Sequence, residues 1–259
     1  MEQGRIAGLH GAWQSFEKHF AKVSGVNGAT MKVKKIGLAV LAVLVCISVL
    51  PARAAPAQWV EGTNYVVLDQ AQPTTVPAGK VEVMEVFSYG CPFCNKFQPV
   101  IHKLERSLPR NTQMVFLPAS FNPNEDWPLF QRAYFTAQAL GIADRTHQAI
   151  YDAVWKTGEL AIEDPSTNRL RQPLPSLTDV AHCYSKLTGV SAQTFVATAQ
   201  SFGVETKMHE ADEQIMAMQI PSTPCIVVGG KYRIVMESLH SVDDLIPLVK
   251  FLVAKASAH

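Results

Sequence analysis

Several common features are missing from this sequence, and each absence narrows what the chain does. It has no internal repeat, no low-complexity tract and no long coiled-coil pattern, so a monomer is the default expectation. Beside its one Cys-x-x-Cys motif there is no second Cys or His pair at close spacing, which disfavours a zinc site. Its longest apolar run, residues 36–50, is short for a membrane span.

That apolar run has the layout of a secretory signal. It follows the basic stretch 31–35 and precedes Ala52-Arg53-Ala54, a small-x-small cleavage site. We therefore expect a signal peptide over 31–54, cleaved after Ala54, with translation from Met31 and residues 1–30 as an upstream extension. An uncleaved N-terminal anchor is the alternative.

Charge and cysteine content are best judged on the chain without residues 1–54. These carry seven of the 23 basic and two of the 22 acidic residues, which leaves 16 and 20 and a net charge of −4. This balance disfavours nucleic-acid or acidic-lipid binding. Cys46 leaves with the signal, and four cysteines remain in a compartment that permits disulfides. About 205 residues remain, enough for one core and an insertion.

The motif Cys91-Pro92-Phe93-Cys94 carries the clearest chemical signal. It lies between an alternating strand pattern over 81–87 and a helical pattern over 94–108. Its first thiol therefore lies near a helix N-terminus, where free N–H groups and the helix dipole favour a thiolate. We interpret the pair as redox-active, with half of a metal site or a structural disulfide as the alternatives.

The order of the predicted elements indicates an α/β domain with a helical insertion. A strand over 113–117 follows the first helix, and Gly229-Gly230 predicts a tight hairpin turn. Residues 164–175 are predicted to be an exposed loop. The other predicted elements are helices over 129–140, 144–156, 176–188, 192–201 and 204–218, strands over 225–228 and 231–235, and a last helix from Asp243.

Three motifs, in this order, resemble the DsbA family of periplasmic thiol:disulfide oxidoreductases. They are residues 85–94 (EVFSYGCPFC), Thr223-Pro224 and residues 228–232 (VGGKY). The resemblance spans about residues 60–255 and implies a thioredoxin-like fold with an all-helical insertion domain. The boundaries we expect are 55–122 and 204–259 for the two parts of the thioredoxin-like domain and 123–203 for the insertion.

The resemblance also implies an activity. Cys91 would be the exposed nucleophile and Cys94 the buried resolving cysteine of an enzyme that works without a cofactor or a metal. The pair would donate its disulfide, through a mixed disulfide, to folding secreted or periplasmic proteins with free cysteines. A DsbB-like, quinone-linked membrane oxidase would restore the disulfide in the periplasm.

Five further residues take roles by the same resemblance. Pro224 would be the cis-proline beside the disulfide, and Thr223 would offer backbone groups to an extended substrate. Pro92 and Phe93 would complete the substrate-binding surface. Glu85 would assist proton movement at the resolving cysteine, with a solvated strand carboxylate as the alternative.

The sequence departs from the family at Phe93, where the best-known members carry histidine. Phenylalanine offers the thiolate neither charge nor donor, so we expect a somewhat weaker oxidant. We expect Cys183 and Cys225 to be unpaired. A periplasmic disulfide reductase, or a non-catalytic protein that binds peptides or metal, is the alternative function. We interpret four aromatic residues as insertion core: Trp127, Tyr134, Phe135 and Trp155. His147 and His182 have no partners at metal-ligand spacing.

Overall fold

The computed structural model describes residues 59–258. The predicted extension, signal peptide and cleavage site, together with Cys46, lie outside these residues. The predicted boundaries at 122/123 and 203/204 stay predictions.

A five-stranded mixed sheet forms the centre of the described chain, in the order β1-β7-β6-β2-β3. Strands β2 and β3 are parallel, and the other neighbouring pairs are antiparallel. The interior strand β2, between β6 and β3, is rich in valine and is buried at every residue after the first, as expected for a strand covered on both faces. The strands are β1 Tyr65–Val67, β2 Val81–Phe87, β3 Thr112–Pro118, β6 Cys225–Val228 and β7 Tyr232–Ile234.

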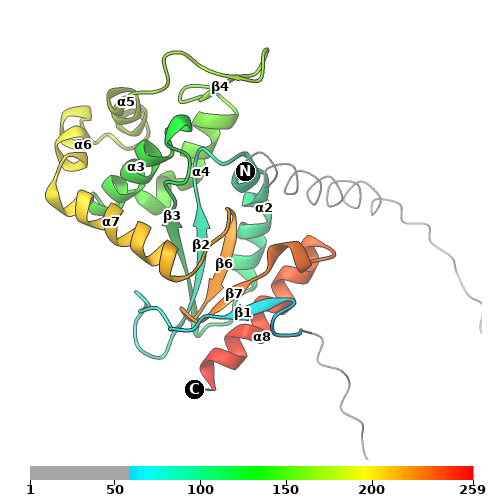
Figure 1. Cartoon of the computed structure of the whole chain (residues 1–259). Coiled ribbons are helices and arrows are strands. Elements are labelled where there is room, and N and C mark those ends of the chain that lie inside the picture. Colours follow the sequence, from blue (N-terminus) through cyan, green and yellow to red (C-terminus); the bar gives the residue numbers. More distant parts are fainter. Residues whose placement is uncertain (1–58, 259) are drawn as a thin grey trace, which may run out of the picture. The chain divides into compact units, whose positions relative to one another are not determined.

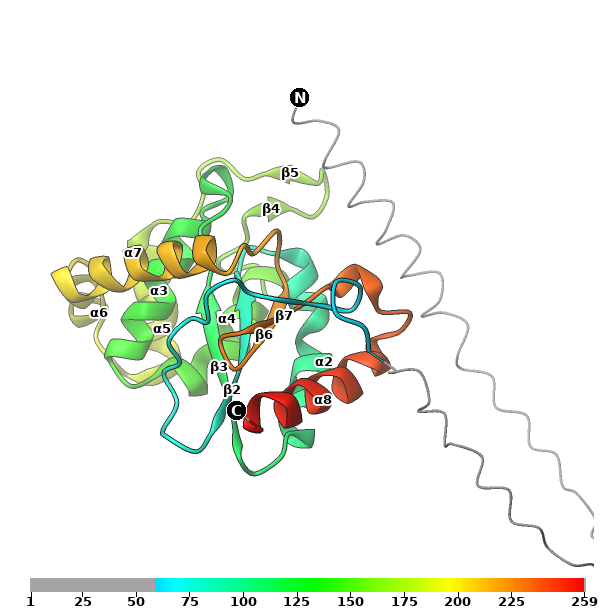
Figure 2. The same ribbon diagram turned by 60° about the horizontal axis from the view of Figure 1, so that its bottom comes forward.

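The helices fall into two groups around this sheet (Figures 1 and 2). Helices α2 and α8 pack against each other, and α8 also packs on β2 and β6. The remaining helices gather at the other side of the sheet, where α3 contacts α4, α5, α6 and α7. The bounds are α2 Pro92–Ser107, α3 Trp127–Ala139, α4 Ala143–Trp155, α5 Leu177–Thr188, α6 Ala192–Ala199, α7 Phe202–Ala217 and α8 Leu245–Ser257, with short 3-10 turns at Pro123–Glu125, Met236–Ser238 and Val242–Asp244.

The predicted hairpin between β6 and β7 is confirmed. Gly229 and Gly230 have φ values of 59° and 61°, the pair of left-handed conformations that a tight two-residue turn requires. The N–H of Lys231 donates to the carbonyl of Val228 at 3.1 Å and closes the turn. The turn therefore fixes the register of the two strands that carry Cys225 and its neighbours.

Two short pairings were not expected from the sequence. Strand β1 lies before residue 81, where the sequence predicts no strand, and it pairs with β7. The expected loop over 164–175 is exposed, but a small hairpin of β4 (Glu163–Asp164) and β5 (Arg169–Leu170) reaches into it. Strands of two or three residues leave too short an alternation to be recognised in sequence. The other predicted strands and helices are confirmed with shifts of one or two residues at their ends.

Candidate active site

Cys91 caps the N-terminus of α2. Its backbone is extended (φ −87°, ψ 114°), Pro92 occupies the first turn, and the Cys94 N–H donates to the Cys91 sulfur at 3.3 Å. Proline suits this place because its missing N–H would have no helical partner. The sulfur therefore lies where the unpaired N–H groups of the helix converge.

This position lowers the pKa of the Cys91 thiol. Burial alone raises the pKa, but hydrogen bonding with the side chains of Cys94 and Thr223 and with the N–H groups of Cys94 and Phe93 outweighs it. The resulting pKa is about 7, against an ordinary value of 9.0. A substantial fraction of the thiol is consequently ionised at neutral pH, and the thiolate is the reactive form.

Cys94 has the opposite environment. It is completely buried, and its pKa lies well above the ordinary value because of burial first, then the Cys91 side chain, then the charge of Glu85. The two thiols differ strongly in acidity although they belong to one turn of helix. This asymmetry suits a pair in which one sulfur attacks or is attacked and the other leaves.

Glu85 lies on β2 and is fully buried. Neither carboxylate oxygen has a hydrogen-bond partner among the described residues. Burial, followed by the Cys91 charge, holds its pKa well above the ordinary value, so the carboxyl is kept protonated beyond its usual range. The alternative of a solvated strand carboxylate is therefore wrong.

The segment before β6 covers the cysteine pair. The Thr223–Pro224 peptide bond is cis, as the resemblance implied. The carbonyl oxygen of Thr223 lies 3.6 Å from the Cys91 sulfur, and the thiol donates to it. The structure thus brings the second of the three motifs, Thr223-Pro224, against the first, from 132 residues away.

One expectation about the cysteines is wrong. Cys91 is only 3% exposed, so both sulfurs are buried in this form of the chain. The Thr223 carbonyl takes the place beside the sulfur where solvent would lie. Pro92 and Phe93 are half-buried and offer more accessible surface than either cysteine.

Helix α4 binds Tyr89, a residue just before the cysteine motif. This contact was not predicted from the sequence. Trp155 donates from its indole nitrogen to the Tyr89 carbonyl at 2.7 Å, and Tyr89 Oη lies 3.0 Å from His147 Nδ1. Burial and then His102 lower the pKa of His147 to about 3, so the imidazole that shares this hydrogen bond with the tyrosine hydroxyl is neutral. Tyr89 is thus anchored at both ends. No local signal pairs it with residues 58 and 66 positions later.

Gly90, the next residue, allows a close approach of α3. A Cβ at this position would lie 2.9 Å from the indole ring of Trp127, closer than real Cβ contacts. Tryptophan was expected as insertion core, and Trp127 is indeed buried. It also lies directly against the loop that precedes Cys91, so the insertion forms part of the wall of the site.

The remaining cysteines lie apart from this chemistry. Cys183 and Cys225 are buried free thiols, as expected, and burial raises the pKa of each, for Cys225 to about 12. Within residues 59–258, no three His, Cys, Asp or Glu side chains gather as metal ligands would. In the same part of the chain, no helix is long and apolar enough to cross a membrane.

A thioredoxin-like sheet with a Cys-x-x-Cys pair at a helix N-terminus defines the class of thiol–disulfide oxidoreductases. No family model matches the chain. It is 30% identical to the thiol:disulfide interchange protein DsbA of Pseudomonas syringae pv. tomato over 222 residues, which cover 85% of this chain and 96% of that protein. It is 31% identical to the protein of the same name from Azotobacter vinelandii over 199 residues, which cover 76% and 85%.

Solved structures give the same result. The crystal structure of Pseudomonas aeruginosa DsbA superimposes with a TM-score of 0.64 at 30% identity and covers 77% of this chain and 95% of that one. The oxidoreductase DsbA of Xylella fastidiosa superimposes with a TM-score of 0.66 at 29% identity, with 76% and 97% covered. The chain belongs to the DsbA family of thiol:disulfide interchange proteins and is an oxidoreductase with a thioredoxin fold and a helical insertion.

Proposed function

We propose that the chain oxidises thiols of folding secreted proteins in the periplasm, with Cys91 as the nucleophilic position and Cys94 as the resolving one. The observation that carries the proposal is the difference between the two sulfurs. The pKa of Cys91 is lowered to about 7, whereas that of Cys94 is raised by burial. The sulfur with the lower pKa is the better leaving group, so Cys91 is released readily from a mixed disulfide.

The reaction transfers two electrons and two protons from substrate to enzyme. A substrate thiolate attacks Cys91, the Cys91–Cys94 bond breaks, and Cys94 leaves as a thiolate that takes up a proton. A second substrate thiolate then attacks the substrate sulfur of the mixed disulfide and releases Cys91. Glu85 is the group proposed to supply the proton, since it is buried beside the pair and holds its proton beyond the usual range.

The same arrangement supports roles for the flanking residues. Thr223 presents its carbonyl at the reactive sulfur, and an extended substrate segment would replace the Cys91 thiol as its hydrogen-bond donor. Pro224, the family's cis-proline by resemblance, directly follows that carbonyl, and its bond to Thr223 is cis. Pro92 and Phe93, the accessible residues of the motif, would meet the substrate. A DsbB-like membrane oxidase would return the pair to the disulfide.

The test is the equilibrium of the Cys91–Cys94 pair with glutathione buffers, read by thiol trapping. A disulfide donor stays reduced except in strongly oxidising buffer. A pair that keeps its disulfide in reducing buffer would contradict the proposal and favour the disulfide reductase. Two single variants identify the cysteine that forms the mixed disulfide with substrate. Cys94→Ser, which keeps Cys91, should form it, and Cys91→Ser should not.

A further inference from the structure

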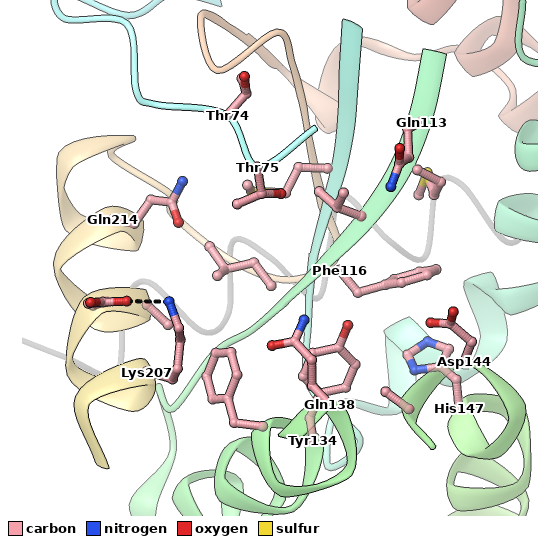
Figure 3. A pocket seen from close by; sticks show the side chains of 18 of the residues that line it. Thr74, Thr75, Gln113, Phe116, Tyr134, Gln138, Asp144, His147, Lys207 and Gln214 are labelled. Atoms are coloured by element: carbon pink, nitrogen blue, oxygen red, sulfur yellow. Dashed lines mark hydrogen bonds and ion pairs between the residues drawn. The ribbon is translucent and has the colours of Figure 1, made fainter. Parts of the chain in front are cut away.

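A groove of about 980 Å³ follows the outer edge of β3 (Figure 3). Strand β3 contributes residues 113–117, and the loop 72–75 and helices α2, α3, α4 and α7 form the sides. None of the lining residues belongs to the cysteine motif or to the Thr223–Pro224 segment. Because β3 is the last strand of the sheet, no described strand pairs with its outer side.

The hydrogen bonds of β3 show which backbone groups face this groove. The carbonyl of Asn111 and the N–H of Ala119, just outside the two ends of β3, both bond to the segment of β2. Backbone groups alternate along a strand, so the odd-numbered residues of β3 face β2. The N–H and C=O groups of Met114 and Phe116 therefore point outward, into the groove.

The two ends of the edge are closed by other contacts. Thr112 turns its N–H to the carbonyl of Pro109 at 3.1 Å, and Gln131 donates to the carbonyl of Pro118 at 3.2 Å. The stretch that stays open is Met114 to Phe116, with two donors and two acceptors. Such an open edge is the site at which an extended peptide adds a further strand.

Aromatic side chains line the groove beside this edge. Phe116, Tyr134, Gln138 and His147 all line the groove (Figure 3). Phe116 is half-buried, and its ring lies against that of His147 with 4.4 Å between the centroids and 35° between the ring planes. The groove thus offers apolar surface for alternate side chains of an added strand.

The charged residues of the groove are mostly acidic. Four carboxylates from three helices line it, against one lysine that is already paired with one of them at 2.7 Å. A ligand with positive charge complements this rim, and one with negative charge is repelled. The residues are Glu105 on α2, Asp144 on α4, and Lys207, Glu210 and Glu213 on α7.

We propose that this groove binds an extended basic segment of a polypeptide by strand addition to β3. Main-chain bonds to Met114 and Phe116 provide the affinity, and the acidic rim selects lysine and arginine beside apolar residues. The identity of the partner, an unfolded protein with free thiols, rests on the proposed function. The groove would hold such a chain while the cysteine pair reacts elsewhere on it.

The probe is a fluorescent, cysteine-free peptide of about eight residues, with alternating Val and Thr and a Lys at each end. A counterpart carries Glu in place of each Lys. Fluorescence anisotropy with the full chain should show that the basic peptide binds more tightly, by an amount that falls with added salt. Met114→Pro removes an outward N–H and no bond within the sheet, and should weaken binding at least about fivefold.

A second variant removes charge without touching the backbone. Glu105→Gln with Glu213→Gln should weaken the basic peptide and reduce its salt dependence. Asp69→Asn with Glu237→Gln removes the same charge outside the groove and should leave binding unchanged. If Met114→Pro does not fold, the comparison of these two double variants alone tests the proposal.

Three results would overturn the proposal. The first is equal affinity for the basic and acidic peptides. The second is wild-type peptide affinity in a folded Met114→Pro variant. The third is a dimer of the chain that Met114→Pro abolishes, because a second copy of the chain would then occupy the groove. Glutathione exchange is measured on the same samples. Normal exchange without peptide binding would refute the groove alone, and peptide binding without exchange would refute the proposed function alone.

Discussion

Raising the pH from about 6 to about 9 should increase the free energy of unfolding of the dithiol form of this chain relative to that of the disulfide form. The pKa of Cys91 is about 7 in the folded chain against an ordinary value of 9.0. Below the folded pKa the thiol is protonated in both folded and unfolded chains, so it contributes nothing. Above it, the folded chain loses the proton first, and the gain in the free energy of unfolding approaches about 3 kcal/mol at the pKa of the unfolded chain.

The same free energy separates the reduction potential of the folded cysteine pair from that of the unfolded pair, because the disulfide form has no Cys91 thiol to ionise. About 3 kcal/mol corresponds to roughly 60 mV for a two-electron couple. The gain should not continue far above the unfolded pKa. Burial raises the pKa of Cys94, so ionisation of that thiol in the unfolded chain begins to oppose it there.

The assay is denaturant unfolding of both forms at about one-unit pH steps, followed by far-UV circular dichroism. Cys183→Ser removes a buried thiol whose pKa is raised rather than lowered, so the rise between the two forms should persist. Cys91→Ser in the reducing buffer should abolish it. Parallel curves for the dithiol and disulfide forms across this range would refute the reasoning.

Three further substitutions test single contacts. Phe93→His should shift the glutathione equilibrium about fivefold toward the dithiol, because a cation near the Cys91 thiolate stabilises it; an unchanged equilibrium would contradict this. Glu85→Gln cannot release a proton and should slow thiol oxidation about tenfold or more in stopped-flow traces, which a wild-type rate would disprove. Tyr89→Phe leaves the buried His147 without this hydrogen-bond partner and should lower the free energy of unfolding in urea by about 1–2 kcal/mol; an unchanged midpoint would argue against this contact.

The sequence predicts those parts of the fold that local pattern decides. Strand β2 and helix α2 carry long periodic patterns, and the Gly229-Gly230 turn has one conformation that suits it. Strand β1 has three residues, and its partner β7 lies far along the chain, so only the folded sheet reveals it. Short strands depend on tertiary pairing rather than on their own pattern.

The site divides in the same way. Spacing and position identified Cys91 and Cys94, because a helix N-terminus is a local feature. Alternation along residues 81–87 suggested one solvated face and left the role of Glu85 undecided. In the folded sheet β2 is an interior strand that is buried on both faces. The exposure predicted for Cys91 was wrong for a similar reason, since Thr223 comes from a distant segment.

The helical insertion belongs to the chemistry of this protein as well as to its shape. Trp155 and His147 lie on α4 and form hydrogen bonds with the carbonyl and the hydroxyl of Tyr89, two residues before Cys91. The cap geometry that lowers the pKa of Cys91 depends on where this loop places the sulfur relative to the N–H of Cys94. A shift of α4 would therefore be transmitted to the redox pair through one residue. The same helix carries Asp144 into the groove along β3, so a peptide bound there would contact the element that positions the reactive thiol.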